Sequence, residues 1–133
     1  MNRYVIDTHI FLWLIFDPKK VSRNNLTILE NPKNDVFLCS SSLWEISIKF
    51  GLNKLKLNGL LPSELPNLMK NMAIQPLDVS HLVMATLFQL PSVDKHKDPF
   101  DRLMIWQCIQ ADYVLLSQDG KFDAYQAFGL KLI

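Results

Sequence analysis

Short, almost wholly apolar runs alternate along the chain with longer segments in which apolar positions recur at helical spacing. The apolar runs predict buried strands at 3–6, 36–39, 113–117 and 130–133, with a further short strand around Pro76-Leu77. Helices are expected at 9–16, 21–30, 40–51, 63–73, 81–90 and 100–111, with a short one inside 118–129. Residues 53–62, with a turn signal at Asn58-Gly59, form either a loop or a short hairpin.

Strands that alternate with helices and lack polar positions are typical of a parallel sheet covered on both faces. We therefore expect an α/β fold, a three-layer α/β/α sandwich with a central, mostly parallel sheet. The chain has 133 residues, which suits one domain spanning 1–133, and it contains no repeat or linker. Ligands of such sheets bind at the carboxyl ends of the strands, so the residues that follow the strands matter most.

Composition excludes several classes of protein. Hydrophobic residues make up 49% and charged residues 20% of the chain, which fits neither disorder nor a membrane protein. The apolar N-terminal run is interrupted by Asp7 and His9 and is too short to cross a bilayer. Cys39 and Cys108 lie in apolar segments and are expected to be buried, reduced thiols. We expect a soluble, cytoplasmic protein.

Acidic residues recur at positions that the predicted fold brings to one edge of the sheet. Asp7 follows the first strand, Asp119 follows the run at 113–117, and Glu45 lies near the start of the helix that follows the second strand. Asp98 and Asp101 open the helix expected at 100–111. The carboxyl ends of parallel strands share an edge, so these acids are expected to approach one another.

Each acid also suits an ordinary structural role. The roles are helix N-caps for Asp7 and Asp98, a turn for Asp119, and for Glu45 a capping box with Ser42 and an ion pair with Lys49. Capping does not explain why all the acids lie on one edge, where they would repel one another unless a hard cation were bound. Oxygen ligands of this kind favour Mg²⁺ or Mn²⁺ over zinc.

Other kinds of site are not supported by the sequence. His9, His81 and His96 lack metal-ligand spacing, and only His96, beside the acids, is kept as a functional candidate. Four glycines cannot supply a phosphate-binding fingerprint. The net charge of +1 demands no nucleic-acid partner, so a basic surface would have to be local.

The motifs "YVIDTHIFLW", "SSLWEISIKFGLNKLKL", "HKDPFDRLMIWQC" and "VLLSQDGKF" occur in this order almost from end to end of the chain. In this combination they closely resemble the PIN-domain family, and within it the VapC-type toxins of type II toxin–antitoxin systems. The resemblance implies that Asp7, Glu45, Asp101 and Asp119 are metal ligands and catalytic residues. It leaves Asp98 as a metal ligand, a catalytic base, a group supporting the ligands, or the helix cap.

The resemblance also assigns supporting residues. Thr8 and Ser117 match hydroxyls that steady the site through hydrogen bonds, and Lys121 stands where some relatives have a further acid. Candidate contacts to substrate or antitoxin are Arg102, His96 and Lys49, with Lys95 and Lys97 nearby. Arg102 is the preferred one, because its planar fork can bind phosphate through two hydrogen bonds.

The resemblance implies a Mg²⁺- or Mn²⁺-dependent endoribonuclease that cleaves RNA phosphodiesters with metal-activated water. It further implies homodimers and a cognate antitoxin, which together would form hetero-oligomers. One alternative is a PIN fold that serves only as a binding module. Another is a phospho-receiver domain, but Asp7-Thr8 is not the pair of acids that such a domain needs, and "VFLCSSS" offers no phospho-accepting aspartate.

Overall fold

A single parallel sheet forms the centre of the computed structural model, which describes residues 2–93 and 96–133. Among these residues the strands are β1 (Arg3–Ile6), β2 (Asp35–Cys39), β3 (Ile74–Leu77), β4 (Val114–Leu116) and β5 (Lys131–Leu132). Their order is β3-β2-β1-β4-β5, and every neighbouring pair is parallel. The expected sheet is thus confirmed, and it is parallel throughout.

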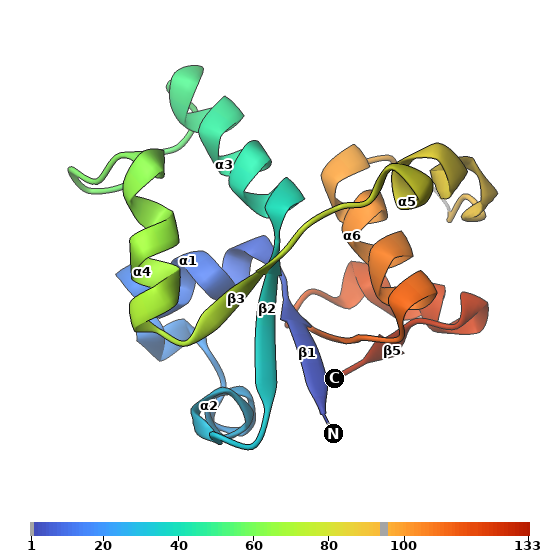
Figure 1. The fold of residues 1–133 in the computed structure, drawn as a ribbon, viewed down its shortest axis with the longest axis horizontal. Helices are drawn as coiled ribbons and strands as arrows, with labels where there is room; N and C mark the ends of the chain where they lie inside the picture. Colours follow the sequence, from blue (N-terminus) through green and yellow to red (C-terminus); the bar gives the residue numbers. More distant parts are fainter. Residues whose placement is uncertain (1, 94–95) are drawn as a thin grey trace.

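Helices cover both faces of the sheet. The α-helices are α1 (Thr8–Phe16), α2 (Arg23–Glu30), α3 (Ser40–Gly51), α4 (Leu65–Asn71), α5 (His81–Thr86) and α6 (Pro99–Ala111). The 3₁₀ segments are η1 (Pro18–Lys20), η2 (Pro62–Glu64), η3 (Leu87–Gln89) and η4 (Gly120–Phe128). Figure 1 shows α1, α2 and α4 on one side of the sheet and α5 and α6 on the other, which is the predicted three-layer arrangement.

The alternation of side chains along β1 divides the hydrophobic core into two clusters. Tyr4 and Ile6 pack with the side chains of α1, β2 and α4, whereas Val5 packs with those of α6 and β4. Successive residues of a strand point to opposite faces, so a strand buried on both faces needs apolar residues at every position. This requirement explains the unbroken apolar run that predicted the strand. Among the described residues, none of the helices is both long enough and apolar enough to span a bilayer.

The structure differs from the prediction mainly between residues 53 and 90. The segment 53–62 contains no strand, so the loop alternative is correct. The helix expected at 63–73 starts as a 3₁₀ turn and becomes α-helical only at Leu65. Strand β3 has four residues, and Pro76 is tolerated within it because β3 is an edge strand. The helix expected at 81–90 is α5 followed by η3.

Both cysteines are free and buried, as the sequence predicts. Burial raises the pKa of Cys39 to about 12, and it also raises the pKa of Cys108. A thiol is nucleophilic only as the thiolate, so neither cysteine is suited to nucleophilic chemistry at neutral pH. The candidate catalytic groups are therefore the acids at the carboxyl end of the sheet.

Leu38 in the middle of β2 provides a test of the core. Its side chain is fully buried, so Leu38→Ala would leave a cavity beneath α1 and lower the free energy of unfolding by about 2–5 kcal/mol. Urea denaturation followed by circular dichroism measures this loss. Leu61→Ala is the control, because Leu61 is 54% exposed and should change stability by less than about 0.5 kcal/mol. Equal losses in the two variants would contradict the described core.

Candidate active site

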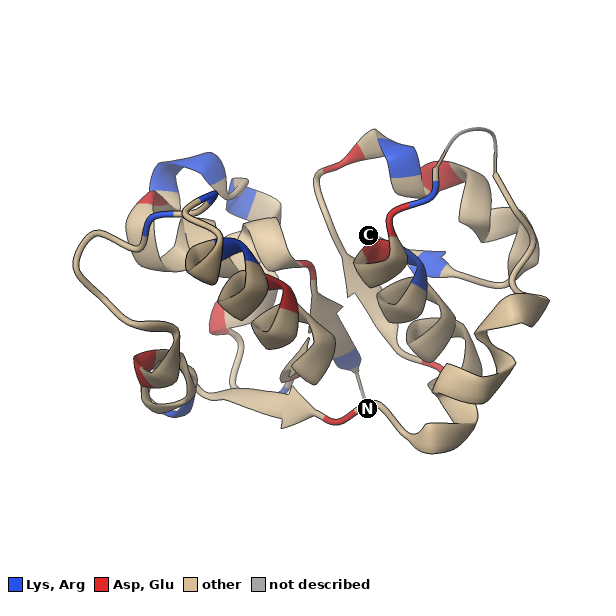
Figure 2. Ribbon diagram, turned by 90° about the horizontal axis from the view of Figure 1, so that it is seen from above, with Lys and Arg blue, Asp and Glu red and all other residues tan. Residues whose placement is uncertain are grey.

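The carboxyl edge, meaning the end of the sheet at which its strands finish, gathers acids from four separate parts of the chain. Asp7 directly follows β1, Asp119 lies three residues beyond β4, Glu45 is on α3, and Asp101 is in the first turn of α6. Figure 2 looks at the molecule from this end and shows Lys and Arg positions beside the Asp and Glu positions. The edge is therefore a mixed site with its own counter-charges.

Asp7 is the most buried of these acids, with 3% of its surface exposed. Its Oδ1 accepts the Ile10 N–H at 2.7 Å as the N-cap of α1, and its Oδ2 accepts the Ser117 hydroxyl at 2.5 Å. Burial raises the pKa of Asp7 above its usual value, although these hydrogen bonds act to lower it. The fold thus keeps a carboxyl group where its ionised form is poorly solvated.

Ser117 links Asp7 to Asp119. The Ser117 hydroxyl that donates to Asp7 also accepts the backbone N–H of Asp119 at 3.1 Å. Asp119 in turn accepts the N–H of Lys121 through Oδ1, which closes the turn that begins η4. The supporting role predicted for Ser117 therefore has a structural basis, because one hydroxyl group fixes two of the acids.

Glu45 is held by the hydroxyl of Thr8 and the ammonium of Lys49. Thr8 donates to Glu45 Oε1 at 3.1 Å, and Lys49 contacts Oε2 at 2.5 Å, so the expected i,i+4 pair is present. The capping box predicted for Glu45 with Ser42 is wrong, because α3 begins at Ser40 and its N-cap makes no side-chain hydrogen bond. Ser42 instead contacts the Thr8 hydroxyl at 2.9 Å.

Lys121 links Asp119 to Asp101. Its ammonium lies 3.0 Å from Asp101 Oδ2 and 3.2 Å from Asp119 Oδ2. Burial of the Asp119 carboxyl acts to raise its pKa, but its bonds to Lys121 outweigh this effect and the net pKa is lowered. Partial burial likewise acts to lower the pKa of Lys121, but its contacts with both acids raise it overall.

A chain of polar contacts supports Asp101 from the other side. His96 Nε2 lies 3.3 Å from Asp101 Oδ2, and its Nδ1 lies 2.7 Å from the Tyr125 hydroxyl. Arg102 donates to the same hydroxyl at 3.2 Å. His96, kept as a candidate because it lies beside the acids in the sequence, is therefore placed to orient Asp101, and its contact with substrate stays a prediction.

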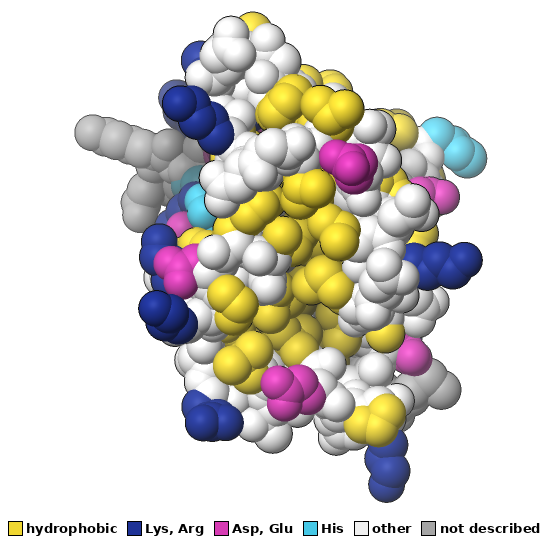
Figure 3. All heavy atoms as spheres, turned by 90° about the vertical axis from the view of Figure 1, so that its left-hand side faces the viewer, with side chains coloured by type: hydrophobic (Ala, Val, Ile, Leu, Met, Phe, Trp, Pro, Cys, Tyr) yellow, Lys and Arg dark blue, Asp and Glu magenta, His cyan; other side chains and the backbone are white. Residues whose placement is uncertain are grey.

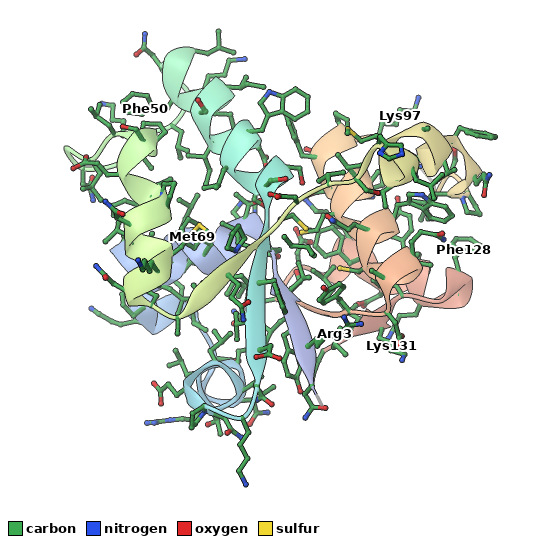
Figure 4. All side chains as sticks on the ribbon, viewed as in Figure 1. Arg3, Phe50, Met69, Lys97, Phe128 and Lys131 are labelled. Atoms are coloured by element: carbon green, nitrogen blue, oxygen red, sulfur yellow. The ribbon has the colours of Figure 1, made fainter. Side chains whose placement is uncertain are left out.

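The predicted cationic contacts lie in different settings. The Arg102 guanidinium donates to the backbone carbonyls of Leu90 and Pro91, so in this structure it links the start of α6 to the segment that follows η3. The predicted grip of Arg102 on phosphate stays a prediction. Lys97 lies beside the start of α6 (Figure 4), whereas Lys95 lies outside the described residues.

Asp98 is the N-cap of α6. Its Oδ1 accepts the N–H groups of Phe100 and Asp101 at 2.9 and 3.0 Å, and Pro99 occupies the first helical position. The structural role predicted for Asp98 is thus confirmed, while a further role as metal ligand or base stays a prediction. Its cap also fixes the backbone of Asp101 at the helix start.

Two hollows of different character lie on the surface. One of about 280 Å³ is lined by Asp7, Asp119 and neighbours from the same loops, namely His9, Trp13, Gln118 and Gly120. The other, of about 540 Å³, is mainly apolar and is lined by side chains between α3, α4 and β3, including Leu43 and Met69. Apolar side chains gather on this side of the molecule in Figure 3, and Met69 points from α4 toward the sheet in Figure 4.

The chemistry of the acidic edge fits a hard divalent cation. The four acids and the hydroxyl groups of Thr8 and Ser117 offer oxygen ligands, and a cationic group, the Lys121 ammonium, already bridges two of the acids. Within residues 2–93 and 96–133, no three His, Cys, Asp or Glu side chains are close enough together to hold a metal ion as they stand. To share one ion, the carboxylates of the acidic edge would have to move closer together than they lie in this structure.

The sequence did not predict three residues that contact the candidate site residues. Lys121 was noted only as the absence of an acid, Ser42 only as a cap, and Tyr125 not at all. Tyr125 contacts His96 across 29 residues of sequence, a separation that no local pattern encodes. For Lys121, the spacing of two residues from Asp119 in a turn was the available signal.

Comparison with known proteins agrees with this architecture. The family model of the PIN domain matches residues 4–127, and the chain therefore belongs to the PIN-domain family. The family predicted from the sequence motifs is thus confirmed. No curated protein sequence matches this chain.

Solved structures share the fold over almost the whole chain. A chain of VapBC2 from Rickettsia felis, bound to a promoter DNA fragment, has a TM-score of 0.70 at 20% identity, covering 98% of this chain and 97% of that one. A chain of DNA-bound VapBC from Salmonella typhimurium has a TM-score of 0.65 at 14% identity, covering 100% and 98%. A chain of FitAcB from Neisseria gonorrhoeae has a TM-score of 0.61 at 18% sequence identity, covering 98% of this chain and 96% of that one.

The buried Asp7 predicts a pH-dependent cost to stability. Folding raises the pKa of Asp7, so the folded protein binds the Asp7 proton more tightly than the unfolded chain does. Protonated Asp7 therefore contributes to stability at low pH, and this contribution is lost as the pH rises through the folded-state pKa. In metal-free protein, Asp7→Asn should be more stable than wild type at pH 7, by about 1.4 kcal/mol for each pKa unit of the shift.

Urea unfolding between pH 3.5 and 7 measures this difference, which should shrink toward the acidic end. Asp123→Asn is the control, since Asp123 is exposed and should show no such trend. A wild-type protein more stable than Asp7→Asn at pH 7 would refute the argument.

Asp98 can be tested as a cap and as a charged group separately. Asp98→Ala should lower the free energy of unfolding by about 1 kcal/mol, whereas Asp98→Asn should change it by only a few tenths, because asparagine caps helices equally well. Thermal denaturation of both variants measures this. If Asp98→Asn keeps its stability but loses a catalytic activity, the negative charge does more than cap the helix.

Proposed function

We propose that this protein is a metal-dependent endoribonuclease, the toxin of a toxin–antitoxin pair. One observation carries the proposal: contacts connect Asp7, Asp119 and Asp101 in a single network at the carboxyl edge, through Ser117 and Lys121. A fold needs no such network for stability, because clustered carboxylates repel one another. Membership of the PIN-domain family supports the assignment to nucleases.

In this proposal Asp7, Asp101 and Asp119 hold Mg²⁺ or Mn²⁺, and Glu45 completes the acidic set. When bound, the ion supplies an activated water and neutralises charge on the phosphoryl oxygens. Ser117 fixes the orientation of Asp7 by donating to Oδ2, which leaves that oxygen's second lone pair for a cation. The chain of His96 and Tyr125 orients Asp101 in the same way.

Glu45 is the residue that we assign to proton transfer. Among the polar contacts of the described residues, its Oε2 has one partner, Lys49, which lies on the same helix and is about half exposed. When an RNA phosphate approaches, Lys49 turns to the phosphate and frees Oε2 to accept a proton from the attacking water. Asp98 is less suited to this task, because its Oδ1 already accepts two backbone N–H groups.

The proposed partner is a small antitoxin protein. The three solved structures compared above come from VapBC and FitAcB complexes, and two of these three are described as bound to DNA. The apolar hollow between α3, α4 and β3 is a surface that a partner chain could cover, since exposed apolar patches mark interaction sites. We also infer homodimers, which the family resemblance implies.

Cleavage of single-stranded RNA by the purified chain in Mn²⁺ or Mg²⁺ tests the proposed activity. Asp101→Asn should lower the rate on the order of 100-fold, because it removes a charged ligand while keeping the shape of the side chain. Chelation by EDTA should abolish cleavage in the wild type. Gel electrophoresis of labelled RNA, with single-stranded DNA in parallel, measures both effects.

Asp112→Asn is the matched control, at the opposite end of the same helix. Asp112 has φ of +60°, which asparagine tolerates, and its exposed ion pair with Lys131 contributes little to stability. Its cleavage rate should equal that of the wild type. Metal-independent cleavage, or equal rates for Asp101→Asn and wild type, would favour the alternative of a PIN fold that only binds.

A further inference from the structure

Lys121 is placed within the acidic site rather than beside it. Its ammonium contacts both Asp101 and Asp119, which come from different elements. An ammonium group has three donors, and two of them are directed at carboxylates that the proposed function assigns to metal binding. The position between two carboxylates from separate elements is one that a bridging cation would take.

The backbone at Lys121 is fixed close to Asp101 and Asp119. Its N–H is bound by Asp119 Oδ1 at 3.1 Å, and the next residue, Phe122, is buried in the core. The ammonium also lies 5.4 Å from the centre of the Phe122 ring. The Lys121 backbone cannot move away without opening η4 and exposing Phe122, so it is anchored at a point from which the ammonium reaches both acids.

The formal charges of the site balance for a single divalent ion. Asp98 is left out of this count because its carboxylate caps α6. The four acids of the proposed function, Asp7, Glu45, Asp101 and Asp119, carry four negative charges, and the ammonium groups of Lys49 and Lys121 contact three of them. Four negative and two positive charges leave two negative charges, which one divalent ion neutralises. A second divalent ion would lie against the Lys121 ammonium in a partly buried site, where repulsion is weakly screened.

We propose that the ammonium of Lys121 takes the place of a second divalent cation, so that each chain binds one Mn²⁺ or Mg²⁺ ion. This inference rests on the proposed function, because it assumes that the acids bind metal. It makes Lys121 a residue that sets the number of metal ions in the site. An acid or a neutral residue at this position would open the second cation position.

The stoichiometry of Mn²⁺ binding to the full, metal-stripped chain tests the inference without reference to activity. The signal of free Mn²⁺ in electron paramagnetic resonance gives the number of ions bound, and isothermal titration calorimetry gives the same number independently. Wild type should bind one ion per chain. Lys121→Met and Lys121→Gln should each bind two, and circular dichroism shows that the variants are folded.

Two further variants separate occupancy from a general effect of charge. Lys121→Arg keeps a cation in the site and should bind one ion, as the wild type does. Lys131→Met removes an exposed lysine at the far end of the sheet, labelled in Figure 4, and should also bind one ion. A rise to two ions in Lys131→Met would show that net charge, and not the place of Lys121, decides the number.

The outcomes distinguish this inference from the proposed function. Two ions bound by wild type, or one ion bound by Lys121→Met even at higher affinity, would overturn the inference and leave the metallonuclease proposal in place. No ion bound by wild type, together with no RNA cleavage, would overturn the proposed function and the inference with it. One ion in wild type and two in the neutral variants supports both.

Discussion

Repulsion among carboxylates at the end of one sheet is the constraint that the surrounding structure has to satisfy. The partners that offset this repulsion are the Ile10 N–H and the Ser117 hydroxyl for Asp7, Thr8 and Lys49 for Glu45, and Lys121 for both Asp101 and Asp119. Hydrogen bonds and opposite charges favour the ionised forms, but burial opposes them, and at Asp7 burial prevails. The bound cation of the proposed function would offset the remaining negative charge.

The parallel sheet is what brings these acids together. Every strand runs in the same direction, so the residue after β1 and the loop after β4 must lie at the same edge, and the helices that follow the strands start there. Burial of both faces makes the strands rigid and apolar, which leaves the loops at the edge to carry polar groups. The core thus determines the position of the site without contributing to its chemistry.

The sequence predicted those features well that depend on residues close together in the chain. The strand at 3–6, the helix start at Asp98-Pro99 and the pair of Glu45 with Lys49 depend on neighbours within a few residues, and all are present. The capping box failed because α3 begins at Ser40, so Ser42 lies inside the helix, where it contacts the distant Thr8 hydroxyl. The strand order and the contacts of Lys121 and Tyr125 could not be predicted, since they arise only when separate segments pack together.

A capping carboxylate and a metal-binding carboxylate have compatible requirements, and this explains why the same residues suit both roles. The N-terminus of a helix carries partial positive charge and free N–H groups, which hold an acid ionised and in a fixed orientation. Asp98 supplies the cap of α6, so Asp101 enters the first turn already oriented toward Asp119 and the Lys121 ammonium. The structural role and the proposed catalytic role of these acids are therefore compatible, because capping preorganises the oxygen atoms that the proposed cation would require.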